Sequence, residues 1–74
     1  MNHDLKDFLA QILNGQDLTE DQSEELMTAL AAGSVEPALA GALLVSLRMK
    51  GESAEEVRGF ANGMRKAAKE VMLK

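Results

Sequence analysis

Apolar residues recur along the chain at helical spacing in four segments. Positions i, i+3, i+4 and i+7 share one face of an α-helix, and this spacing predicts helices at about 4–14, 20–32, 37–50 and 54–71. Nothing in the chain has the composition and alternation of a β-strand. We therefore predict an all-α fold, a small bundle of four short helices that forms a single domain over residues 1–74.

Residues with known capping roles stand at the predicted helix ends. Asp4 is the predicted N-cap of the first helix. The pairs Thr19 with Gln22 and Ser53 with Glu56 have the spacing of a capping box, in which the N-cap and the third helical residue bond each other's backbone amides. Three glycines stand where helices should stop: Gly15, Gly33 and Gly51.

The segment 37–50 is apolar around most of its circumference. Pro37 suits the first position of a helix, where no amide partner is needed. At about 100° per residue, the apolar side chains leave only a narrow strip for Arg48 and Gly41. A helix of this kind must be covered on several sides, and a chain this short without cysteines has little core to spare. Part of this helix is predicted to meet a second chain or domain.

A broad apolar face on the first helix adds to this surplus. A two-fold interface lets one surface patch cover its own copy, which is the commonest arrangement in soluble homo-oligomers. We therefore predict a symmetric homodimer formed through the helix at 37–50 with help from the first helix. The predicted interface residues are Leu5, Phe8, Leu9, Ile12, Leu39, Leu43, Leu44 and Leu47.

The last helix carries an apolar stripe and two glycines. Val57, Phe60 and Met64 have the spacing of a buried helix face. Gly59 and Gly63 lie four residues apart inside the helix, and each costs about 1 kcal/mol of helix propensity relative to alanine. We predict that they permit another backbone to approach closely.

Composition and charge exclude several classes of function. Twelve acidic residues against eight basic residues give a net charge of −4, which repels a phosphate backbone and argues against a nucleic-acid partner. The chain has neither an apolar run long enough to cross a membrane nor the start of a signal peptide. These observations predict a soluble cytoplasmic protein without a membrane partner.

Residues with catalytic or metal-binding chemistry do not form a recognisable group. His3 is the only histidine and cysteine is absent, so we predict no metal site. The neighbouring carboxylates Glu55 and Glu56 point apart on a helix, as do Glu24 and Glu25, and we interpret both pairs as solvated faces. The sequence predicts no catalytic, cofactor-binding or metal-ligating residue.

The corner "LRMKGESAEE" joins the third and fourth helices. We interpret it as a helix stop followed by a capping box, not as a phosphate-binding loop. Arg48 and Lys50 are interpreted as exposed cations at a helix end, and contact with another domain or a partner's acids is the alternative.

Residues 15–65 resemble the N-terminal helical segment of anthranilate phosphoribosyltransferase, from the glycosyl transferase family with a helical bundle domain. The resemblance is carried by "DLT" after a leucine-rich helix, by the apolar helix that ends in "LRMKGES", and by "EEVRGFANGMR". Pyrimidine nucleoside phosphorylases share this domain, but the "LRMKGES" corner is more similar to the anthranilate enzyme. Glu36 and Gly63 depart from the serine and alanine common at these positions.

The resemblance implies a helical domain that later helices complete and through which homodimers form. It also implies that phosphoribosyl pyrophosphate and magnesium bind in an α/β catalytic domain, at a Gly-Thr-Gly-Gly-Asp loop absent from these 74 residues. We therefore expect no enzymatic activity and no cofactor in this chain alone, with magnesium serving only the full-length parent enzyme of tryptophan biosynthesis. The first hypothesis is a dimerisation domain or fragment of that enzyme. The alternative is a stand-alone helical module for protein–protein interaction.

Overall fold

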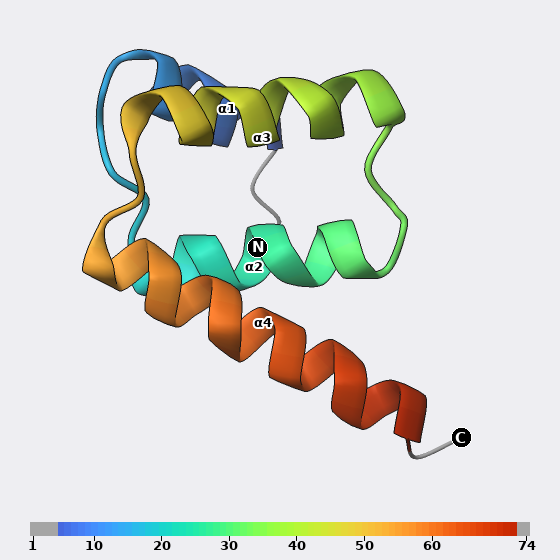
Figure 1. The fold of residues 1–74 in the computed structure, drawn as a ribbon. Coiled ribbons are helices and arrows are strands. Elements are labelled where there is room, and N and C mark those ends of the chain that lie inside the picture. The colour runs from blue at the N-terminus through green and yellow to red at the C-terminus, as the bar shows by residue number, and fades with distance from the viewer. Residues whose placement is uncertain (1–4, 73–74) are drawn as a thin grey trace.

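The computed structural model describes residues 5–72 and contains four α-helices. They are α1 (Leu5–Leu13), α2 (Glu20–Ala31), α3 (Pro37–Lys50) and α4 (Ala54–Met72) (Figure 1). Each helix begins and ends within one residue of its predicted bounds. The prediction of an all-α fold is confirmed, and the described residues contain no strand. His3 and Asp4, for which the sequence led to predictions, lie outside the described residues.

The helices form two layers. α1 packs beside α3 in one layer, and α2 packs beside α4 in the other (Figure 1). α4 runs in the same direction as α2, whereas α3 runs the opposite way. The C-terminal part of α4 extends past the other helices, so the molecule is longest in one dimension, at 39 Å. This arrangement leaves the end of α3, the start of α4 and the loop before α2 at one corner.

The predicted capping boxes are both formed. The amide N–H of Gln22 donates to Thr19 Oγ1 over 3.1 Å, and the Thr19 N–H donates to Gln22 Oε1 over 2.9 Å. The Glu56 N–H donates to Ser53 Oγ over 3.1 Å, and the Ser53 N–H donates to Glu56 Oε1 over 2.8 Å. The three predicted stops have positive φ, a region that glycine adopts without steric cost: Gly15 at 78°, Gly33 at 71° and Gly51 at 89°.

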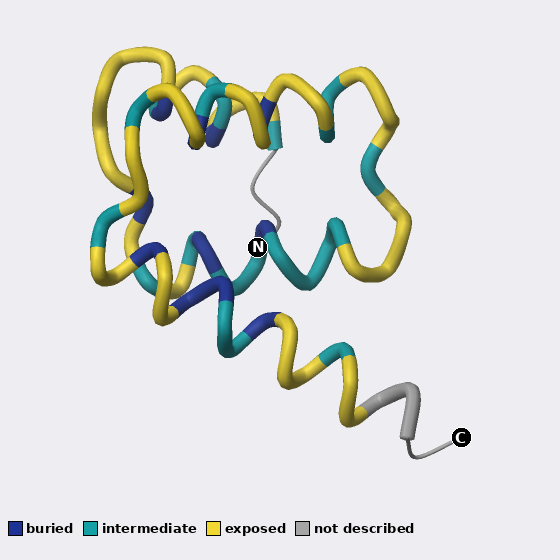
Figure 2. The backbone as a smooth tube through the Cα atoms, viewed as in Figure 1, coloured by how far each residue is buried: buried dark blue, intermediate teal, exposed yellow. Residues whose placement is uncertain are grey.

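The core lies between the two layers (Figure 2). Its members come from all four helices and from the loop between α1 and α2, which contributes Leu18. Burial of such apolar side chains is the main favourable contribution to folding. The buried apolar residues are Phe8, Ile12, Leu18, Leu26, Leu43, Leu47 and Phe60.

The two glycines of α4 lie against α2, which confirms the predicted close approach. A Cβ built on Gly59 would lie 2.3 Å from the carbonyl oxygen of Glu20, and one built on Gly63 would lie 2.8 Å from the Cβ of Met27. α4 therefore turns its glycine side toward α2, and the predicted apolar stripe is only partly right. Phe60 is buried, but Val57 and Met64 are more than half exposed.

Candidate interaction surface

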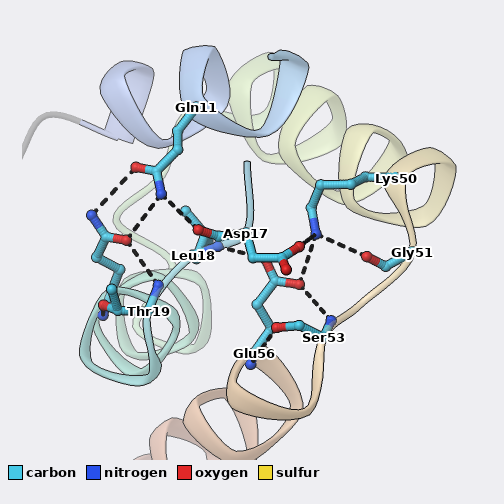
Figure 3. A network of polar contacts seen from close by, with 9 residues as sticks. Gln11, Asp17, Leu18, Thr19, Lys50, Gly51, Ser53 and Glu56 are labelled. Atoms are coloured by element: carbon cyan, nitrogen blue, oxygen red, sulfur yellow. Dashed lines mark hydrogen bonds and ion pairs between the residues drawn. The ribbon is translucent and has the colours of Figure 1, made fainter. Parts of the chain in front are cut away.

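A buried carboxylate joins the three segments that meet at the corner of the fold (Figure 3). Glu56 at the start of α4 is fully buried, and its Oε2 accepts a hydrogen bond of 2.7 Å from the backbone N–H of Leu18. Its Oε1 accepts from Lys50 Nζ at 2.9 Å and from the Ser53 N–H. Lys50 also donates to Asp17 Oδ1 at 2.7 Å. Glu56 therefore caps α4 and also connects it to the loop before α2 and to the end of α3.

Charge and hydrogen bonding keep Lys50 and Glu56 ionised. Burial alone raises the pKa of Glu56, but hydrogen bonds from Lys50, Ser53 and Leu18 outweigh it and lower the pKa below its ordinary value. Burial likewise lowers the pKa of Lys50, while its bonds to Asp17 and Glu56 outweigh that effect and raise the pKa. The pair therefore stays charged across the physiological range.

This cluster has the features of a structural link and not of a catalytic centre. Each oxygen of Glu56 already accepts a hydrogen bond, and the side chain has no exposed surface for a substrate to reach. Lys50 uses all three of its N–H donors, the third on the carbonyl oxygen of Gly51 at 2.8 Å. A carboxylate that is saturated and enclosed cannot act as a general base toward an outside molecule.

Two sequence interpretations are wrong at this corner. Glu56 was expected on a solvated face, yet it is buried, because its capping-box bond turns it back toward the loop that carries Leu18. Lys50 was expected as an exposed helix-end cation, but its side chain is only 9% exposed and is paired with two carboxylates. The interpretation of Arg48 as exposed is correct.

An exposed apolar surface on α3 has the properties of a binding surface. Leu44 is 51% exposed, Val45 59% and Met49 83%. These three side chains border a groove between α3, α2 and α4 with a volume of about 430 Å³. Large exposed apolar surfaces on soluble proteins mark sites where another molecule binds. The groove is lined by Met27, Leu30, Leu44, Val45, Leu47, Arg48, Met49, Glu52 and Phe60.

The predicted interface residues fall into two groups in the structure. Half of them form the core that holds α1 and α3 together: Phe8, Ile12, Leu43 and Leu47. These side chains are at most 4% exposed, so they offer almost no surface to a partner in the folded chain. The others are exposed or partly buried: Leu5, Leu9, Leu39 and Leu44. Sequence reasoning missed Val45 and Met49, although the predicted apolar circumference of this helix was the signal for them.

Neither metal chemistry nor a membrane span is found in the described part of the chain. Among residues 5–72, no three histidine, aspartate or glutamate side chains gather as ligands for a metal ion. No helix within that range combines the length and apolar character required to cross a membrane. A second depression beside α2 is lined by three carboxylates and six other residues: Leu5, Asp21, Glu24, Glu25, Thr28, Ala29, Ala32, Ser34 and Lys66.

Comparison with known proteins gives consistent matches over most of the chain. Residues 6–68 match the glycosyl transferase family, helical bundle domain. Anthranilate phosphoribosyltransferase of Saccharolobus islandicus is 47% identical over 64 residues, which cover 86% of this chain and 19% of the relative. The same enzyme of Anaeromyxobacter sp. strain K is 42% identical over 67 residues, covering 90% and 20%. That of Teredinibacter turnerae is 43% identical with the same coverage.

The chain thus spans about a fifth of the length of these relatives. The matched residues include all of α2 and α3, and the four-helix fold agrees with a helical bundle. The chain belongs to the glycosyl transferase family, helical bundle domain, and is homologous to the N-terminal helical domain of anthranilate phosphoribosyltransferase.

Proposed function

We propose that this chain is the helical dimerisation domain of an anthranilate phosphoribosyltransferase of tryptophan biosynthesis, acting in the cytoplasm. Similarity to relatives that carry this enzyme's name supports the choice of parent. In this proposal the 74 residues mediate dimer formation and do not perform the transfer reaction. The α/β catalytic domain of the parent enzyme binds phosphoribosyl pyrophosphate and magnesium, as the resemblance implies.

The exposed apolar side of α3 is the observation that carries the dimerisation role. Leu44, Val45 and Met49 lie within two turns of one helix and are each at least half exposed. Their burial against a second surface removes apolar area from water, which is the dominant favourable contribution to association. Leu43 and Leu47 of the same helix are already fixed in the core. α3 is therefore held rigidly while it presents an apolar surface outward.

The self-association of the 74-residue chain tests this proposal. Sedimentation equilibrium from low micromolar to several hundred micromolar should give one dimeric species in a reversible equilibrium with monomer. A chain that stays monomeric over the whole range contradicts the proposal. A series of larger species also contradicts it, because a symmetric two-fold contact closes at two subunits.

Far-UV circular dichroism of the same samples is the control for folding. The helical signal should be retained at the lowest concentration, since the buried apolar cluster is formed within one chain. A helical signal that disappears on dilution would show that folding and association are inseparable, and the surface of α3 could then not be described as a preformed interface.

A further inference from the structure

We draw no further inference here: the strongest candidate, the apolar groove that α3 forms with α2 and α4, carries none because nothing in the structure shows what covers it.

Discussion

Gly59 of α4 and Ser23 of α2 lie so close that a Cβ built on the glycine would be 2.5 Å from the Cβ of the serine. Ser23 is fully buried, and its side chain is small enough to fit between the two helices. The Lys66 Nζ and Glu24 Oε2 atoms, 3.0 Å apart, form an ion pair across the same helices. The contact between α2 and α4 is therefore set by small residues inside and by charged side chains at its edge.

Gly59→Ala should destabilise the domain by about 1–3 kcal/mol, the range for overpacked sites. The added methyl group meets the backbone oxygen of Glu20, which cannot rotate away as a flexible side chain would. Gly41→Ala is the matched control, because a Cβ at that position of α3 would meet no atom of another described segment within 4 Å. It should stabilise the domain by about 0.5–1 kcal/mol through helix propensity alone. Urea unfolding measures both, and a stabilised Gly59→Ala variant would show that the helices are not in close contact.

Ser23→Ala should leave stability unchanged or raise it by about 1 kcal/mol. The Ser23 Oγ atom is buried and has no hydrogen-bond partner among the described residues, so its removal relieves an unfavourable burial without disturbing the helix contact. Alanine keeps the Cβ that lies against Gly59 and has the higher helix propensity. Thermal unfolding is the measurement. A clear fall in the midpoint would mean that the hydroxyl has a partner in solution, such as a buried water.

The sequence was sufficient to predict features that depend on neighbouring residues. The Thr19 capping box and the glycine stops follow from local spacing, and Gly59 indicated a close contact because an interior glycine weakens a helix. The position of Glu56 was not predictable in this way. Its contact with Leu18 joins residues 38 positions apart, and it depends on how the loop after α1 folds over the start of α4. Charge alone favoured a solvated position for Glu56.

The surface of α3 likewise combines a feature that local spacing predicts with one that depends on tertiary packing. An apolar circumference predicted that this helix needs covering on several sides, but it did not indicate which side the chain covers itself. Packing of α1 against Leu43 and Leu47 decides that, and it leaves Met49 exposed. The side that remains for a partner is therefore a property of the tertiary structure.

Lys50→Met should destabilise the domain by about 3 kcal/mol. The substitution keeps the apolar stem but leaves the buried carboxylate of Glu56 without its cation, and burial of an uncompensated charge is costly. Asp17→Asn is the control within the same cluster. Asp17 is 59% exposed, so loss of its ion pair with Lys50 should cost less than about 1 kcal/mol. A similar loss of stability in the two variants would contradict the assignment of Glu56 as the main partner of Lys50.

The stability of the domain should depend on pH through this same pair. The pKa of Glu56 is lowered from 4.5, so its contribution is present above about pH 4.5 and is lost as the pH falls through the lowered pKa. The pKa of Lys50 is raised from 10.5, so its contribution is present below about pH 10.5 and is lost as the pH rises through the raised pKa. The contribution of this pair to the thermal midpoint should therefore be constant between these limits and decrease beyond them.

The double variant Lys50→Met with Glu56→Gln isolates the contribution of the pair to this profile. It removes both charges together, so its midpoint should start lower and fall less steeply at acid and alkaline pH than that of the original chain. Glu55→Gln changes the neighbouring exposed carboxylate and should leave the shape of the profile unchanged. If the double variant follows the original profile at both ends, other groups control the pH dependence. The ionisation of Lys50 and Glu56 would then contribute little to the stability of the domain.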